Sequence, residues 1–297
     1  MSRVFCSVLL LVTLLLFNEP SPLRAQDVEV NPVAATTAGA PAERTAEKEP
    51  AQLQTPPRFV LPAEQHVWAR FEPGSWREVR ITTETFNSEA EVINRSVTTQ
   101  KEVLKSVAEE TYALEVQATV DLVGKRIVGD WKQRVLKLAT DKAGEILDMQ
   151  PLGDESFSYE GGDIECQIWE LRYLDDSRQM LDRIAYHPQQ FPYVMLRETR
   201  EFAQESSLQE VEQSVEVTAS AVPYVVEGKM TLCSCLRTTR RRAKGSSIRV
   251  AFVSPTIPGG DVAAWSSDFD SQHQLSRWST FELLGFGQPD SQQADGR

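Results

Sequence analysis

The cysteines come nearest to a chemical site in this sequence. Cys166, Cys233 and Cys235 lie in the body of the chain, and Cys6 lies in an apolar run at its start. Cys233 and Cys235 are two residues apart, so in a strand their side chains share one face and are badly placed to bridge each other. Two states remain open: a disulfide from Cys166 to Cys233 or Cys235, or three free, buried thiols.

Metal binding by this C-x-C pair, with His187 as a third ligand, would suit a soft ion such as copper(I). The sequence places too few further ligands nearby. We therefore expect no metal and no other cofactor.

A run of basic residues stands out in a chain whose formal net charge is −12. Its members are Arg237, Arg240, Arg241, Arg242 and Lys244. The run follows a predicted strand and precedes Gly245, so we expect it near the tip of a hairpin. Guanidinium groups bind phosphates and carboxylates through charge-assisted hydrogen bonds. The same charges can also serve as a solvated loop that keeps a sheet edge from aggregating, and the sequence leaves both interpretations open.

Spacings typical of hydrolases are missing from the sequence. The three histidines, His66, His187 and His273, form no H-E-x-x-H pair, and no G-x-S-x-G is present. Carboxylates are so numerous that a pair of catalytic carboxylates for glycoside hydrolysis could be chosen in many ways. Their presence therefore does not indicate a glycosidase. We therefore favour a non-enzymatic protein and keep an undetected hydrolase as an alternative.

The start of the chain predicts export. Arg3 precedes an apolar run over residues 4–17, and a proline-containing segment follows that ends at the small residue Ala25. This order is typical of a secretory signal peptide, and the run is shorter than the roughly 20 residues of a membrane-spanning helix. We expect cleavage near Ala25 and a secreted or periplasmic protein without an integral membrane span. Its acidic charge disfavours a nucleic-acid partner.

Composition divides the rest of the chain into three parts. Residues 26–57 are rich in Ala, Pro and Glu with few large apolar side chains, which predicts a disordered linker. Residues 58–287 hold all six tryptophans and are expected to form the folded domain. Residues 288–297 are polar and are expected to be a disordered tail.

Strand patterns dominate residues 58–287. Apolar and polar residues alternate clearly over residues 112–122, and glycines punctuate the segments between such runs. One long strand is predicted over Tyr224 to Leu236. Residues 88–108 fit either a helix or two strands joined near Gln100. We predict a mainly β fold, an antiparallel meander or half-barrel with at most one or two short helices.

An internal repeat is a further prediction. A shift of 67 residues aligns the two segments without a gap and places Cys166 on Cys233 and Pro188 on Pro255. Each copy begins with an aromatic residue and a turn, continues as a strand through the cysteine, and reaches the proline after a second strand. The predicted repeats span residues 157–219 and 224–287.

The leader, the alternating strands and the segment Leu122-Val-Gly-Lys125 that closes one of them resemble uncharacterised secreted bacterial β-sheet proteins. More loosely, the pattern is similar to the half-barrels of LolA-type lipoprotein carriers. That resemblance implies a bent sheet whose concave apolar face holds an acyl chain. It transfers no ligand-contacting residue to this sequence.

The resulting hypothesis is a non-enzymatic extracytoplasmic β protein that binds an apolar, amphipathic or lipid-like ligand or serves the cell envelope. The alternative is a polysaccharide- or protein-binding module that uses the basic hairpin tip and exposed tryptophans.

Overall fold

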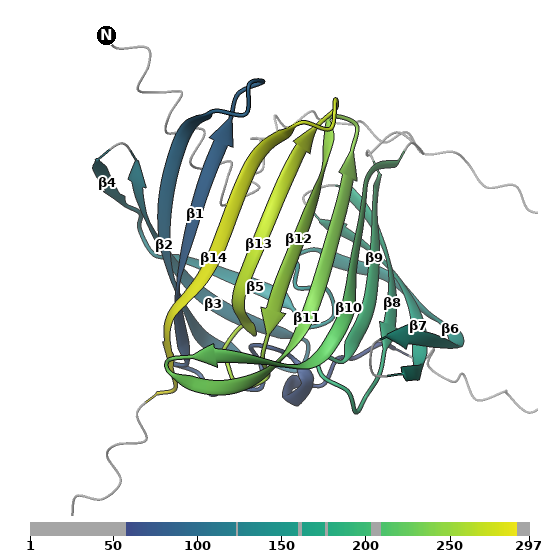
Figure 1. Cartoon of the computed structure of the whole chain (residues 1–297). Coiled ribbons are helices and arrows are strands. Elements are labelled where there is room, and N and C mark those ends of the chain that lie inside the picture. The colour runs from purple at the N-terminus through teal and green to yellow at the C-terminus, as the bar shows by residue number, and fades with distance from the viewer. Residues whose placement is uncertain (1–57, 123, 160–161, 176–177, 203–208, 290–297) are drawn as a thin grey trace, which may run out of the picture. The chain divides into compact units, whose positions relative to one another are not determined.

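The computed structural model describes residues 58–289 apart from residue 123 and residues 160–161, 176–177 and 203–208 (Figure 1). The predicted signal peptide, the predicted linker and residues 290–297 of the predicted tail lie outside the described residues. Those three predictions therefore stay predictions.

The described part of the chain folds as one antiparallel sheet of fourteen strands. The strands are β1 (Trp76–Phe86), β2 (Val92–Val107), β3 (Thr111–Leu122), β4 (Lys125–Val128), β5 (Lys132–Lys137), β6 (Glu145–Tyr159), β7 (Gly162–Asp175), β8 (Arg178–Tyr186), β9 (Val194–Phe202), β10 (Gln209–Val226), β11 (Lys229–Arg242), β12 (Gly245–Val253), β13 (Asp261–Asp270) and β14 (Leu275–Gly287). A single short 3-10 helix, η1 (Ala63–Gln65), accompanies them in the described residues. The prediction of a mainly β, antiparallel fold is confirmed.

The strand order explains how the sheet is held together and where it stays open. Most strands pair with their neighbours in sequence, and β1 also pairs with β14, which joins the two ends of the described chain. β4 and β5 both pair with β3 at one edge, and β6 pairs with β7 at the other. Since β5 and β6 do not pair, the curled sheet in Figure 1 has two edges.

Two local predictions need correction, and one strand, β13, was not predicted. Residues 92–107 form one continuous strand through Gln100, neither a helix nor two strands, because β2 pairs along its length with β1 and β3. The strand predicted over Tyr224 to Leu236 is a hairpin, because Glu227 and Gly228 turn the chain with positive φ angles of 48° and 76°. β13, whose residues 262–264 are all buried, lacks the alternation that marks a half-exposed strand.

Two non-strand segments pack against one face of the sheet, which we call the inner face. The entry segment, residues 58–75, places the Trp68 ring 5.3 Å from the guanidinium carbon of Arg77 on β1. The connecting loop, residues 138–144, accepts a hydrogen bond from Arg197 of β9 at the carbonyl of Ala139, at 2.6 Å. Buried side chains from both segments and the sheet form the core there.

Away from these segments, polar side chains cross the inner face. Directly paired residues share a face of a sheet, and one row of pairs crosses seven strands. This row consists of Asp182, Thr199, Gln213, Arg240, Ser247, Asp268 and Arg277. These strands therefore do not form the continuous apolar face that the resemblance to LolA-type carriers implied.

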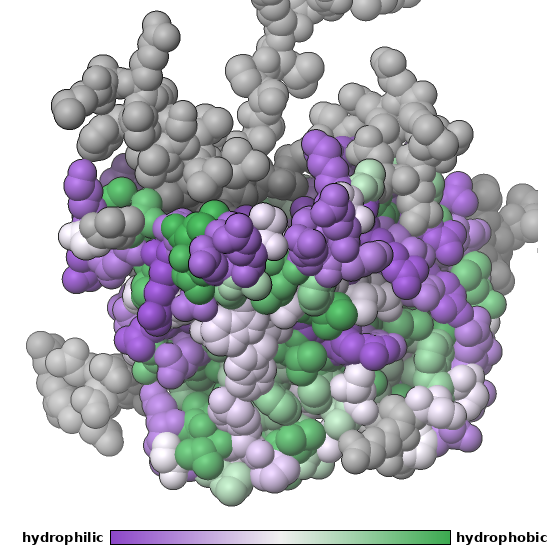
Figure 2. Space-filling model, turned by 45° about the horizontal axis from the view of Figure 1, so that its top comes forward, coloured by the Kyte–Doolittle hydropathy of each residue, from purple (hydrophilic) through white to green (hydrophobic). Residues whose placement is uncertain are grey.

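The outer face of the same strands carries the exposed side chains Ile248, Trp265 and Trp278. Figure 2 shows hydrophobic side chains gathered in the lower half of the surface in view, beneath a more hydrophilic band. The described residues include no helix with the length and hydropathy that a membrane crossing needs.

Strand bounds recur at the spacing of the predicted repeat. β7 begins and ends 67 residues before β11, and β8 does so relative to β12. The turns that follow β8 and β12 also match: the N–H of His187 donates to the carbonyl of Tyr193 and that of Ser254 to Gly260, both at 2.8 Å. Two copies of one unit would produce this agreement, and the repeat stays a prediction.

Candidate binding pocket

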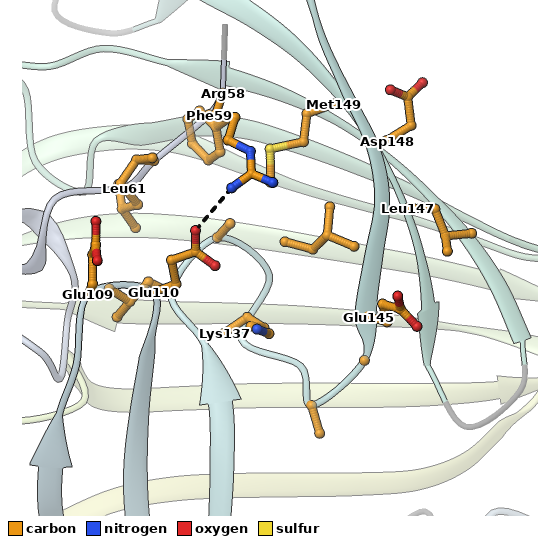
Figure 3. A pocket seen from close by; sticks show the side chains of 16 residues that line it. Arg58, Phe59, Leu61, Glu109, Glu110, Lys137, Glu145, Leu147, Asp148 and Met149 are labelled. Atoms are coloured by element: carbon orange, nitrogen blue, oxygen red, sulfur yellow. Dashed lines mark hydrogen bonds and ion pairs between the residues drawn. The ribbon is translucent and has the colours of Figure 1, made fainter. Parts of the chain in front are cut away.

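A pocket of about 490 Å³ lies between the two edges of the sheet (Figure 3). Four segments line it: residues 58–61 of the entry segment, 109–110 between β2 and β3, 137–139 at the end of β5, and 143–149 at the start of β6. The pocket exists because β5 and β6 do not pair. Its volume falls within the range of roughly 300–1,000 Å³ that small-molecule sites occupy.

Apolar side chains form the floor of the pocket. Phe59 and Leu61 are buried, and they pack with half-buried Ile146 and Met149 of β6. The Phe59 ring also lies 5.6 Å from the rings of Trp169 and Tyr186, so the sheet fixes its position. This floor can bury part of an apolar ligand without rearrangement of the fold.

Charged side chains surround the floor, and acids outnumber bases. The acids are Glu109, Glu110, Glu145 and Asp148, and the bases are Arg58 and Lys137. Arg58 and Glu110 form an ion pair at 3.5 Å across exposed positions. This rim favours a ligand whose polar end is neutral or positively charged.

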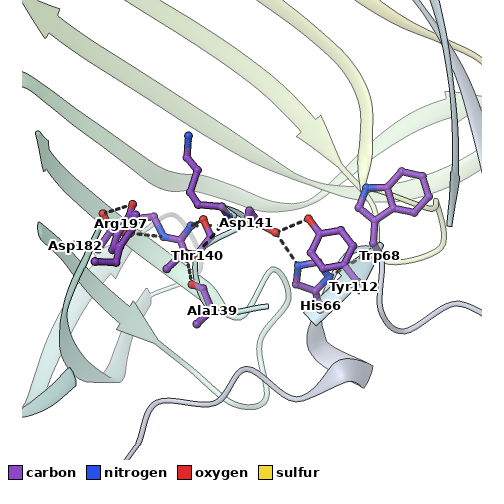
Figure 4. Close-up of polar contacts among 10 residues, drawn as sticks. His66, Trp68, Tyr112, Ala139, Thr140, Asp141, Asp182 and Arg197 are labelled. Atoms are coloured by element: carbon purple, nitrogen blue, oxygen red, sulfur yellow. Dashed lines mark hydrogen bonds and ion pairs between the residues drawn. The ribbon is translucent and has the colours of Figure 1, made fainter. Parts of the chain in front are cut away.

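The walls of the pocket are joined by the buried imidazole of His66 (Figure 4). Its Nδ1 accepts hydrogen bonds from the backbone N–H groups of Trp68 and Ala69, each at 3.1 Å. Its Nε2 therefore carries the proton and donates to Oδ1 of Asp141 at 2.8 Å. The Tyr112 hydroxyl donates to the same oxygen at 2.9 Å. His66 thus connects the entry segment to the connecting loop and to β3.

This arrangement leaves His66 no nitrogen for catalysis. A catalytic histidine needs one ring nitrogen free to exchange a proton with a nucleophile or substrate. Both nitrogens of His66 are taken by partners within the fold. An Asp–His pair can indicate a hydrolase, but the pair of Asp141 and His66 holds two segments of the fold together.

Arg197 anchors the connecting loop to the inner face. Besides its bond to the Ala139 carbonyl, its guanidinium lies 3.7 Å from Asp182 and 4.0 Å from Asp141. Burial raises the pKa of Asp182, against the charge of Arg197 and hydrogen bonds from Thr199 and Tyr173. Desolvation also raises the pKa of Asp141, whose side chain is still 47% exposed, but the hydrogen bond from His66 and the charge of Arg197 prevail and lower this pKa.

The sequence-predicted cysteines lie away from the pocket. In the structure Cys166 and Cys233 are buried free thiols and Cys235 is a half-buried free thiol, and the choice between the two predicted states stays open. Cys166 and Cys233 are buried in separate apolar clusters. Among the described residues, no three His, Cys, Asp or Glu side chains come together as metal ligands.

The basic run is divided between the two faces of β11. Arg237 and Arg241 lie on the outer face and form ion pairs with Glu216 and Glu212 of β10. Arg240 and Arg242 alternate with them and lie on the inner face. Of the five basic residues of the run, only Lys244 lies in the turn between β11 and β12.

Sequence reasoning missed the pocket and the His66 joint. Phe59 and Leu61 could have indicated part of the pocket floor, because they are among the first large apolar residues after the proline-rich segment. Nothing in the sequence indicated that residues near positions 60, 110 and 145 would meet.

Comparison with solved structures yields distant likenesses. A "putative lipoprotein" from Parabacteroides distasonis is 9% identical with a TM-score of 0.32, and the match covers 75% of this chain and 98% of that chain. A "putative exported protein with YmcC-like fold" from Bacteroides fragilis is 10% identical with a TM-score of 0.32, covering 73% and 97%. No protein family matches the chain, and no curated protein does. These likenesses assign no function to this chain.

Proposed function

We propose that this chain is a non-enzymatic, extracytoplasmic binding protein that holds an amphipathic ligand in the pocket between β5 and β6. The pocket itself carries the proposal: it encloses about 490 Å³ and has an apolar floor beneath a carboxylate-rich rim. The extracytoplasmic location is inferred from the leader-like residues 1–25.

The ligand class follows from the two layers of the pocket. The floor of Phe59, Leu61 and Met149 favours an alkyl or similar apolar group. The rim favours a neutral or cationic polar end over an anionic one, because an anion would meet four carboxylates and two bases.

Support for a preformed site comes from its walls. His66, Arg197 and the Tyr186 hydroxyl, which donates to Gln65 Oε1 at 2.5 Å, tie the entry segment and connecting loop to the sheet. A preformed pocket binds more tightly because little ordering entropy is lost on binding.

Displacement of a fluorescent apolar probe, N-phenyl-1-naphthylamine, from the purified protein tests the proposal. We expect dodecylammonium to displace the probe at lower concentration than dodecanoate. The variant Met149→Gln removes apolar surface from the floor and should weaken dodecylammonium binding about tenfold, which corresponds to about 1.4 kcal/mol.

The matched control is Met230→Gln. Met230 is 68% exposed on β11 and does not line the pocket, so the same substitution there should leave binding unchanged. Equal weakening by both variants, a preference for dodecanoate, or no displacement by either alkyl compound would contradict the proposal.

A further inference from the structure

A second cluster of charges lies on the inner face around Glu201. This carboxylate is 4% exposed, and it pairs with Arg178 of β8 and, at 3.5 Å, with Arg240 of β11. Two guanidinium groups from separate strands therefore share one buried carboxylate.

A third guanidinium belongs to the same face. Glu201 pairs in register with Val211 of β10, and Val211 pairs with Arg242 of β11. Because directly paired residues share a face, Arg242 lies on the same side as Glu201 and Arg240. Among the residues that the structure describes, Arg242 has no ion-pair partner. The three arginines and Glu201 carry a local charge of about +2.

Hydrogen-bonding capacity is left over in this cluster. A guanidinium has five N–H donors, yet within the described chain Arg240 bonds only to Glu201, through Nη2. Its Nε is buried without a hydrogen-bond partner there. Burial, then the positive charge of Arg242, lowers the pKa of Arg240 although Glu201 opposes this shift, as expected where positive charge is incompletely neutralised.

We propose that Arg178, Arg240 and Arg242 form an oxyanion-binding site on the inner face, which takes a phosphate or sulfate group. Guanidinium groups suit such a ligand because their donors match oxyanion geometry and their charge persists at any physiological pH. Glu201 holds two of the three arginines in place, and its single charge leaves the cluster positive. The site is independent of the pocket between β5 and β6 and takes the opposite charge.

Calorimetric titration of the purified protein with inorganic phosphate and with inorganic sulfate, at ionic strength held constant with sodium chloride, tests this site. We expect saturable binding of at least one of the two anions. The substitution Arg242→Gln should weaken it about tenfold.

The neighbouring substitution Arg241→Gln is the matched control, since Arg241 is also exposed but lies on the outer face beside Glu212. It should leave anion binding unchanged. Because both side chains are exposed, neither variant should prevent folding, and thermal unfolding without the anion checks this. Saturable binding of neither anion, or an equal loss in Arg241→Gln and Arg242→Gln, would overturn the proposal. Neither outcome bears on probe binding in the pocket.

Discussion

His66 and Asp141 are 75 residues apart, and the 2.8 Å hydrogen bond between them joins the two segments that wall the pocket. His66 belongs to the entry segment that carries Phe59 and Leu61, and Asp141 to the connecting loop between Leu138 and Ala143. The two sheet edges do not pair with each other here. Side-chain hydrogen bonds of this kind therefore hold the two segments together in place of backbone hydrogen bonds between strands.

Replacement of Asp141 should loosen this joint. Asp141→Ala removes the acceptor for His66 and Tyr112 and places alanine at a φ of 56°, so we expect a loss of about 2–3 kcal/mol in the free energy of unfolding. Asp141→Asn keeps an acceptor oxygen and tolerates this backbone region, so its loss should stay below about 1 kcal/mol. Urea unfolding of both variants measures the difference; equal losses would show that the acceptor does not matter.

Acid should reduce the advantage of the wild type over Asp141→Asn. The folded protein lowers the pKa of Asp141, because the hydrogen bond from His66 and the charge of Arg197 outweigh the desolvation of this carboxylate. The resulting stabilisation is complete above the unfolded-state pKa of about 3.9 and is lost as pH falls through the folded-state value. Asp182, whose pKa shifts upward, is present in both proteins and cancels. Unfolding free energies measured from about pH 6 to about pH 3 should therefore converge; a constant difference would argue against the lowered pKa.

Local sequence patterns predict much of this fold, and contacts between distant segments explain the rest. The alternation over residues 112–122 marks β3, because one face of that strand is buried and the other is not. β2 was ambiguous because its apolar residues do not keep a single period. The pairing of β1 with β14 and the meeting of Phe59, Glu110 and Met149 depend on chain closure over long distances, which periodicity does not encode.

The turn after β12 should depend on Gly260. This residue has a φ of 78°, and an added Cβ would lie 3.1 Å from Cγ1 of Val67. We expect Gly260→Ala to destabilise the protein by about 1–2 kcal/mol. Gly285→Ala is the control, since a Cβ there would meet Trp76 at an ordinary 3.6 Å. Thermal unfolding should separate the two variants, and similar melting temperatures would contradict the expectation.

The buried ion pair between Arg77 and Glu102 offers a test of charge burial. Both side chains are 10% exposed, and their atoms Nε and Oε2 lie 2.5 Å apart. Glu102→Leu leaves the guanidinium buried without its main partner and should cost about 3–5 kcal/mol. The double variant Arg77→Met with Glu102→Leu should cost less, because Asp261 retains Arg249 at 3.0 Å. Chemical denaturation of Glu102→Leu, Arg77→Met and the double variant gives the coupling energy between the two residues. If the losses of the single variants add up to that of the double variant, the predicted coupling is contradicted.

Thiol labelling should separate the cysteines by burial and decide between the two predicted redox states. Burial raises the pKa of the Cys166 thiol to about 11, and Cys166 and Cys233 are 1% and 2% exposed. Because the thiolate is the reactive form, iodoacetamide at neutral pH should modify both slowly, whereas half-buried Cys235 should react first. Mass spectrometry of the non-reduced protein, labelled before and after unfolding in urea, follows each site. Three labelled thiols after unfolding are expected from the structure, and one labelled thiol would establish the disulfide instead.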